Sequence, residues 1–141
     1  LLLGRAENAY QSLQSILPTN PKNKGNGMEP YAIANMYFGP QAKVRAGYAP
    51  SSWITGTAGW VYRIISEMML GIKPDYDGLV IDPCLPEAMT DVTVKRVFRG
   101  VTYHIALKRT GSYALFVDGK PVDGKKACLN GSSELQVTCE C

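Results

Sequence analysis

The spacing of apolar residues changes near Lys73 and Pro74, and this change limits what the chain can fold into. Before that point apolar residues recur every three or four positions, the period of a helix with one buried face. After it apolar and polar residues alternate, as they do in half-buried strands. Helices followed by strands are typical of an α+β protein. We therefore expect two domains, residues 1–73 and residues 74–141.

Three helices are expected in the first part, near residues 5–17, 29–38 and 57–70. The second would begin at Glu29-Pro30, because proline is tolerated in the first turn of a helix. The third has the strongest pattern, with a C-terminal cap at Gly71. Its apolar stripe consists of two rows, Trp60, Ile64 and Met68 in one and Val61, Ile65 and Met69 in the other. This stripe predicts a buried helix face.

Short strands separated by turn signals are expected after residue 75. Alternating residues predict strands around residues 79–81, 92–97, 101–107, 113–117, 120–122, 127–129 and 135–137. Six or more such strands are typical of an antiparallel β-sandwich, here expected to be jelly-roll-like. No helix longer than two turns is expected after residue 90.

Composition excludes several classes of protein. The chain has 141 residues, of which 45% are hydrophobic, and a net charge of +3. This charge is too small to indicate binding to nucleic acid or to a membrane surface. No apolar run is long enough to span a bilayer, and Leu1-Leu2-Leu3 lacks the flanks of a signal peptide. We expect a cytoplasmic protein.

The four cysteines do not form a recognisable metal or disulfide motif. They are Cys84, Cys128, Cys139 and Cys141, and no two have the C-x-x-C spacing. We expect reduced thiols and no metal site.

A stretch of small residues, Thr55-Gly56-Thr57, precedes the third helix. A helix N-terminus presents free N–H groups and a positive dipole end, so this stretch could bind an anion. Thr55 or Thr57 could instead serve only as the helix cap, and the residue types alone favour this interpretation. Spacing alone leaves both interpretations open.

Spacing alone also predicts no complete active site. His104 stands on the polar face of its strand without a neighbouring nucleophile, so a solvated position is expected. Asp75 and Asp77 share a turn, where aspartate is common for conformational reasons. Trp53 and Trp60 could stack on a ligand ring, but Trp60 at helical spacing fits a core position better.

Several motifs in order resemble the C-terminal part of the inverting glycoside phosphorylases, glycoside hydrolase family 94. That family includes cellobiose, cellodextrin and chitobiose phosphorylases. The similarity covers about residues 4–122. The residues that carry it are Glu29 to Met36, Arg45-Ala46-Gly47, Ser52 to Arg63, Leu70 to Leu79, Ile81 to Pro86 and Arg99 to Ile105. The sequence around Asn35 and the sequence W-I-T-G-T-A-G-W are most similar to those of the cellodextrin phosphorylase branch.

The resemblance implies a fold and a reaction. Residues 1–73 would be the last helices of an (α/α)6 barrel, and residues 74–141 a C-terminal β-sandwich. The family reaction is reversible phosphorolysis of a β-glucosidic bond, giving α-glucose 1-phosphate with inversion. Inorganic phosphate is the co-substrate, and no cofactor is expected. The geometry parallels that of inverting hydrolysis, with phosphate in place of water.

The resemblance also assigns residues. Thr55 would hold phosphate through its hydroxyl and Gly56 through its backbone N–H. Asn35 falls where the family places a polar residue, often Gln, that touches the donor sugar. The general acid is an Asp expected upstream, so no catalytic residue is expected within this chain.

The expected partners are a β-linked gluco-oligosaccharide and phosphate. The isolated chain is expected to be inactive, and to pair as a homodimer or with the rest of the parent enzyme. Two alternatives stay open. A carbohydrate-binding or structural β-module would use exposed aromatic residues such as Tyr103, Tyr113 or Phe116. A glycoside hydrolase on the same barrel would not need the Thr-Gly anion site.

Overall fold

The computed structural model describes residues 1–23, 25–50 and 56–141. The chain divides into two compact units, and each is described by itself below. The sandwich unit comprises Leu1–Glu7 and Ile64–Cys141, and the loop unit comprises Asn8–Arg63. No described helix has the length and apolar character that crossing a bilayer requires.

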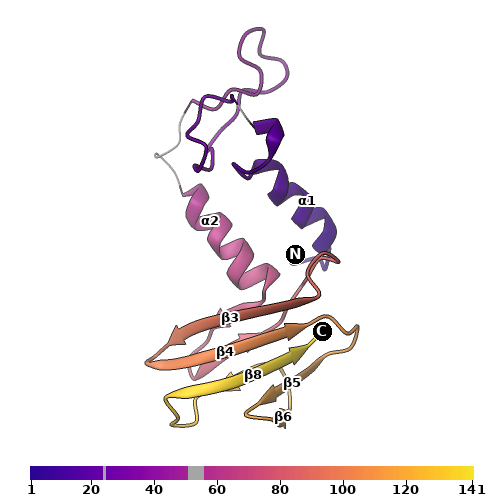
Figure 1. Cartoon of the computed structure of the whole chain (residues 1–141), viewed down its shortest axis with the longest axis vertical. Coiled ribbons are helices and arrows are strands. Elements are labelled where there is room, and N and C mark those ends of the chain that lie inside the picture. The colour runs from indigo at the N-terminus through magenta and orange to yellow at the C-terminus, as the bar shows by residue number, and fades with distance from the viewer. Residues whose placement is uncertain (24, 51–55) are drawn as a thin grey trace. The chain divides into compact units, whose positions relative to one another are not determined.

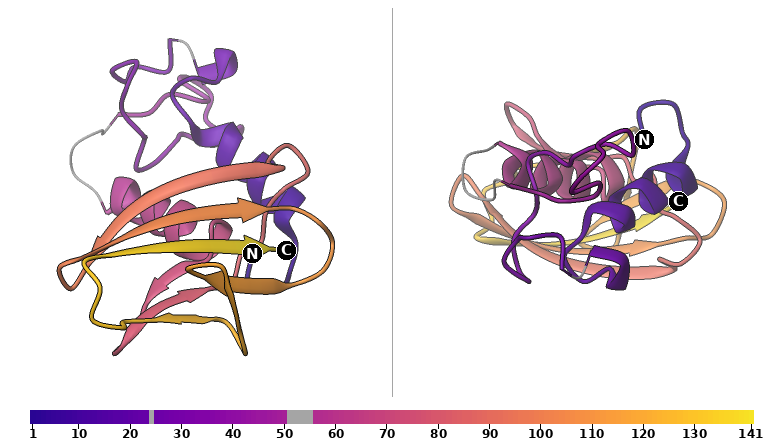
Figure 2. Two further views of the ribbon diagram at one scale, coloured as in Figure 1. Left: turned by 60° about the horizontal axis from the view of Figure 1, so that its bottom comes forward. Right: turned by 90° about the horizontal axis from the view of Figure 1, so that it is seen from above.

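Eight strands form two sheets in the sandwich unit. One sheet has the order β1-β2-β7 and the other the order β3-β4-β8-β5-β6. Figure 1 shows β4 between β3 and β8, and Figure 2 shows the same strands turned forward. The strands are β1 (Ile72–Pro74), β2 (Gly78–Ile81), β3 (Asp91–Phe98), β4 (Val101–Lys108), β5 (Ala114–Val117), β6 (Lys120–Val122), β7 (Lys126–Cys128) and β8 (Glu134–Glu140).

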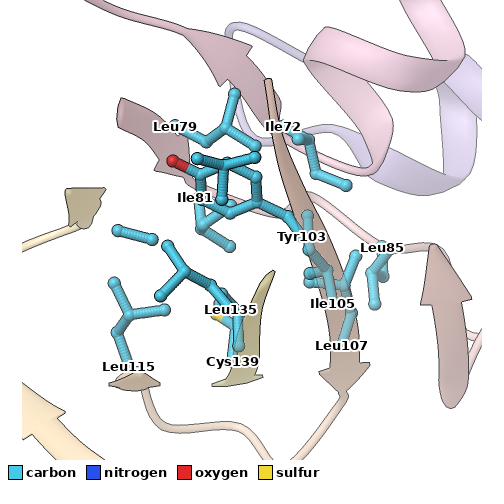
Figure 3. Close-up of a cluster of buried hydrophobic side chains, with 13 residues drawn as sticks. Ile72, Leu79, Ile81, Leu85, Tyr103, Ile105, Leu107, Leu115, Leu135 and Cys139 are labelled. Carbon is cyan, nitrogen blue, oxygen red and sulfur yellow. The ribbon is translucent and has the colours of Figure 1, made fainter. Parts of the chain in front are cut away.

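One hydrophobic core joins the two sheets, so the predicted β-sandwich is present. Leu79 and Ile81 of β2 are fully buried against Tyr103 and Ile105 of β4 and Leu135 of β8 (Figure 3). Every second residue of β4 is buried, which is the alternation that the sequence shows. The α+β class and the predicted strands are therefore confirmed. β1 (Ile72–Pro74) was not predicted, so the expectation that strands occur only after residue 75 is wrong.

One strand pair corrects the expectation of a wholly antiparallel sandwich. β8 runs parallel to β4, with Ile105 opposite Val137, and antiparallel to β5, with Leu115 opposite Cys139. The C-terminal strand thus lies between two strands that precede it. Alternation of apolar and polar residues has the same period in both kinds of pairing. The sequence pattern therefore could not reveal the direction of β8.

An ion network fixes the turn between β1 and β2. The ammonium of Lys126 on β7 lies 2.6 Å from Asp75 Oδ2 and 2.9 Å from Asp77 Oδ1. The hydrogen bonds from Lys126 lower the pKa of both carboxyl groups, and for Asp75 the backbone N–H of Tyr76 adds to the effect. The same contacts raise the pKa of Lys126. The turn predicted at Asp75 and Asp77 is thus tied to a neighbouring strand.

We expect this network to add an acid-sensitive component to stability. Both carboxyl groups have a lower pKa in the folded chain, so they favour folding above their unfolded pKa of about 3.9. That contribution is lost as the pH falls through the folded pKa values. The difference in urea midpoint between wild type and Lys126→Met should be constant from about pH 7 to about pH 5 and shrink below about pH 4.

Lys120→Met is the matched control, because Lys120 is exposed and has no ion-pair partner among the described residues. Its difference from wild type should show no such break. A Lys126→Met difference that stayed constant down to about pH 2 would contradict the assignment.

Two of the three predicted helices are confirmed in position. α1 spans Ala6–Ile16, with Leu13 buried. The third predicted helix is present as α2 (Thr57–Arg63) followed directly by the π-helix η2 (Ile64–Met69). A short 3-10 helix, η1 (Pro21–Asn23), follows α1 in the loop unit.

The helix predicted near residues 29–38 is wrong. The segment contains a single turn, in which Ala32 N–H donates to the Glu29 carbonyl at 3.0 Å, and is otherwise non-helical. Aromatic, β-branched and Asn residues make up most of residues 31–38, and these are weak helix formers. At the end of the segment, Phe38 N–H instead donates to the Tyr48 carbonyl.

The π-helical turn changes the predicted apolar stripe. Leu70 N–H donates to the Ile65 carbonyl at 2.9 Å, an i to i−5 bond that inserts an extra residue into the turn. Val61 and Met69 are buried, but Trp60 is 59% exposed. The core position expected for Trp60 is therefore wrong within this chain.

Candidate functional site

The candidate site begins at the first turn of α2. The Gly56 carbonyl accepts the first helical hydrogen bond, from Trp60 N–H at 2.9 Å, so Gly56 is the N-terminal cap residue. Gly56 is exposed, and a Cβ placed on it would lie 3.5 Å from the Trp60 ring, an ordinary contact. Its backbone is therefore open to an approaching group. Thr55 and Trp53 lie outside the described residues.

A side-chain hydrogen bond joins two positions that sequence motifs placed separately. Thr57 Oγ1 donates to Asn35 Oδ1 at 3.3 Å, across 22 residues of sequence. Asn35 therefore lies beside the first turn of α2, next to Gly56. The sequence interpretation named Asn35 and Gly56, and it treated Thr57 as part of a possible anion site or as a helix cap. No sequence signal marked Thr57 as the residue that connects them.

A closed loop extends between Asn35 and α2. Phe38 N–H donates to the Tyr48 carbonyl and Gly47 N–H donates to the Phe38 carbonyl, both at 2.9 Å. The rings of Phe38 and Tyr48 stack with centroids 6.1 Å apart. A Cβ on Gly27 would lie 2.1 Å from the Tyr48 ring, so only glycine allows this packing. We call residues 38–48 the stacked loop.

A small cavity of about 150 Å³ lies in the same unit. Its polar lining includes Asn26, Glu29 and Tyr37, and its apolar lining includes Ile16 and Met28. Glu29 is the single acidic residue of Asn8–Arg63. The described residues contain no cluster of His, Cys, Asp and Glu that could hold a metal ion.

The hydroxyl, amide and N–H groups at the start of α2 can bind a polar or anionic ligand. Proton transfer to a leaving group is most often carried out by an imidazole or a carboxylic acid, and the carboxylic acid of the loop unit is Glu29, which lines the cavity. The histidine of the chain, His104, belongs to the sandwich unit, where its Nε2 lies 3.6 Å from Glu134 Oε2 on the outer sheet face. The structure therefore brings together binding groups in the loop unit.

The three aromatic residues proposed for a carbohydrate-binding β-module differ in exposure and do not form a common exposed surface. Tyr103 is fully buried in the core, and Phe116 is half-buried. Tyr113 is 39% exposed, but its hydroxyl donates to the Ile81 carbonyl at 2.7 Å and Lys125 covers its ring. These contacts favour structural roles for Tyr103 and Tyr113.

Residues 1–71 match the glycosyl hydrolase 94 superfamily, catalytic domain. The chain therefore belongs to this superfamily. The matched residues include Asn35, the stacked loop and the start of α2.

Similarity to individual proteins covers both units of the chain. The chain is 42% identical over 128 residues to solabiose phosphorylase of Paenibacillus borealis, covering 86% of the chain and 16% of that protein. It is 34% identical to N,N'-diacetylchitobiose phosphorylase of Vibrio furnissii, covering 96% of the chain and 18% of that protein. It is 33% identical to 3-O-beta-D-glucopyranosyl-beta-D-glucuronide phosphorylase of Paenibacillus borealis, covering 99% of the chain and 19% of that protein. The chain thus spans less than a fifth of the length of these relatives.

Proposed function

We propose that the chain is the C-terminal part of an inverting glycoside phosphorylase. The enzyme would cleave the β-glucosidic bond of a gluco-oligosaccharide with inorganic phosphate and release α-glucose 1-phosphate. Phosphate attacks the anomeric carbon while a carboxylic acid protonates the leaving oxygen, as water and an acid do in inverting hydrolysis. The acid is an Asp upstream of this segment. No cofactor takes part.

The contact between Asn35 and Thr57 carries this proposal. It places a candidate sugar-binding amide beside the first turn of α2, where Gly56 leaves its backbone open. Phosphate bound by Thr55 and Gly56 would then lie next to a sugar bound by Asn35. This adjacency is what direct attack of phosphate on the anomeric carbon requires. The names of three relatives, all phosphorylases, support the same reaction class.

We also propose a domain arrangement for the parent enzyme, based on the family match. Residues 1–73 would supply the last helices of an (α/α)6 barrel, and residues 74–141 the C-terminal sandwich. Four aromatic or apolar side chains of the loop unit are at least 59% exposed, Tyr31, Val44, Trp60 and Tyr62. Where exposed apolar side chains gather into one patch, they mark an interface. We propose that the rest of the parent enzyme, or a second copy, covers it.

Phosphorolysis of a substrate panel tests the function. We propose cello-oligosaccharides as substrates, and the relatives add solabiose, N,N'-diacetylchitobiose and a glucosyl glucuronide to the panel. The full-length enzyme should release a sugar 1-phosphate only when phosphate is present, and this product is glucose 1-phosphate when the substrate is a cello-oligosaccharide. Release of the free sugars without phosphate would identify a hydrolase instead. The isolated chain should release neither product, because it lacks the general acid.

Thr55→Val in the full-length enzyme should weaken phosphate binding. The substitution keeps the side-chain volume but removes one hydrogen bond to a charged group, a loss of about 1–3 kcal/mol. The phosphate KM and direct calorimetric titration with phosphate measure the change. Thr93→Val is the control, because Thr93 is exposed on β3 of the sandwich unit. Equal phosphate affinity in Thr55→Val and wild type would reduce Thr55 to a helix cap.

A further inference from the structure

β3 lies at the border of the five-stranded sheet. In the strand order β3-β4-β8-β5-β6, its one neighbour among the described strands is β4, as Figure 1 shows. The pairing of β3 with β4 runs without a break from Asp91 opposite Lys108 to Phe98 opposite Val101. β3 therefore has no bulge, and its sequence D-V-T-V-K-R-V-F has no proline. Bulges and prolines are two of the features that keep border strands from pairing with other chains.

Every second residue of β3 directs its backbone N–H and C=O groups away from β4. Arg109 N–H donates to the Thr90 carbonyl at 2.8 Å, so these two residues form a hydrogen-bonded pair next to β3. Hydrogen-bonded and non-hydrogen-bonded pairs alternate along an antiparallel ladder. The backbone groups of the even-numbered residues 92–98 therefore face β4, and those of the odd-numbered residues 91–97 face away. Within the described part of the chain, no other segment forms backbone hydrogen bonds with these odd-numbered residues.

The exposed face of β3 carries two opposite charges. Asp91, Thr93 and Lys95 are exposed, whereas the intervening Val92 and Val94 are half-buried and pack against the hydrophobic core. Neither Asp91 nor Lys95 forms an ion pair with another described residue. A lysine on a border strand normally discourages pairing. In β3 a carboxylate lies four residues away on the same face, so a second copy of the strand offers the lysine a partner.

Two copies of β3 can pair antiparallel about a two-fold axis, and their charges select one register. Because the free backbone groups belong to odd-numbered residues, odd-numbered residues must lie opposite each other. An axis at Thr93 places Asp91 of each copy opposite Lys95 of the other. An axis at Asp91 or at Lys95 instead places like charges opposite each other, which is destabilising. An axis at Val92 or at Val94 places each charge opposite an uncharged residue. The axis at Thr93 therefore gives the complementary pairing.

We propose that two copies of the chain associate through β3 and join their five-stranded sheets into one. On the exposed face, pairs of opposite charge and a pair of threonines at the axis are combinations that stabilise antiparallel sheets. On the other face, Val92 of each copy lies opposite Val94 of the other and extends the hydrophobic layer. The partner is a second copy because the complementary charges belong to a single strand. The proposal does not depend on the phosphorylase function.

Charge reversal in the full-length enzyme tests the pairing. Lys95→Asp places two carboxylates opposite each other on both sides of the axis, and Asp91→Lys does the same with two ammonium groups. Each single variant should raise the Kd of self-association at least about tenfold, as measured by sedimentation from about 1 to about 100 μM. The double variant, Asp91→Lys with Lys95→Asp, restores opposite charges. Its Kd should return to within about threefold of wild type.

A control separates this pairing from a general effect of charge. Lys120→Asp makes the same change of charge as Lys95→Asp, but on β6 at the other border of the sheet. It should leave the Kd within about threefold of wild type. Thermal unfolding followed by circular dichroism should show that every variant is folded, because the substituted residues are exposed.

Cysteine substitution in the same enzyme tests the register. In the proposed pairing the two Thr93 Cα atoms face each other at about 5.5 Å, a distance that a disulfide can span. Oxidation of Thr93→Cys should therefore link two subunits through the peptides that contain residue 93, as identified by mass spectrometry. Lys95→Cys is the matched control. Its two Cα atoms would lie more than about 13 Å apart along the strands, too far for a disulfide.

Three results would overturn the proposal. They are a wild type that stays monomeric at about 100 μM, single charge variants that associate as wild type does, and a disulfide formed by Lys95→Cys but not by Thr93→Cys. A monomer whose odd-numbered β3 amides resist hydrogen exchange would show that another segment of the parent enzyme covers this strand. Phosphorolysis is assayed separately, so failure of either proposal can be recognised without the other.

Discussion

Replacing Gly71 with alanine is expected to destabilise the chain by about 3–5 kcal/mol, among the largest effects of a single substitution. Gly71 has a φ of +68°, which alone costs alanine about 1–2 kcal/mol. The added Cβ would also lie 2.0 Å from the carbonyl oxygen of Asp82 and 2.5 Å from the nitrogen of Pro83. Both atoms belong to the backbone, so the contact cannot be relieved by a change of rotamer.

Gly100→Ala is the matched control for Gly71→Ala. Gly100 has a φ of +80° in the turn between β3 and β4, but a Cβ there would meet no atom within 4 Å. The control should lose only the conformational term of about 1–2 kcal/mol. Urea unfolding followed by far-ultraviolet circular dichroism measures both variants. Equal losses would show that Asp82 and Pro83 move aside and that close packing at Gly71 is unimportant.

Substitutions of Tyr103 are expected to have effects of opposite sign. The Tyr103 side chain is fully buried, and its hydroxyl has no hydrogen-bond partner among the described residues. Tyr103→Phe keeps the ring and removes the unpaired group, so stability should stay equal or rise by up to about 1–2 kcal/mol. Tyr103→Ala should cost about 3–5 kcal/mol, as for other aromatic residues removed from a core.

Tyr113→Phe provides the chemical control for Tyr103→Phe. The Tyr113 hydroxyl donates to the Ile81 carbonyl at 2.7 Å, so its removal should cost about 1 kcal/mol. The same loss of one oxygen atom should thus lower stability at Tyr113 and preserve it at Tyr103. Burial raises the pKa of both phenols, which keeps them neutral across the pH range of such measurements. A loss of more than about 1 kcal/mol in Tyr103→Phe would contradict an unpaired hydroxyl.

The strands were predictable because their side chains carry a clear two-residue period. β4 alternates buried and less buried residues over its whole length, and its partners do the same. The direction of β8 was not predictable, because strand direction depends on the path of the chain through other strands. The helix expected near residues 29–38 failed for a different reason. The apolar residues of this segment do have helical spacing, but most of its residue types have low helix propensity. The end of the segment instead forms a backbone hydrogen bond with Tyr48.

The candidate site was predictable only in part. The small residues before α2 indicated an open helix start, and the structure shows this at Gly56. The contact between Asn35 and Thr57 depends on the fold of the intervening loop, which has no sequence period. The phosphate-binding role of Thr55 stays a prediction.

The position of β8 makes the sandwich sensitive to the order of synthesis. β8 is the central strand of its sheet, yet it is the last of the eight strands to leave the ribosome. Until then, β4 and β5 each present a row of unpaired backbone groups, the kind of edge on which other chains add. Every residue pair between β8 and β4 also spans a long stretch of sequence, which slows formation of this pairing. A nascent chain that stalls within β7 would therefore expose the unpaired edges of β4 and β5, to which other chains can add. Chaperones that cover β-strand edges would be needed at that stage of translation.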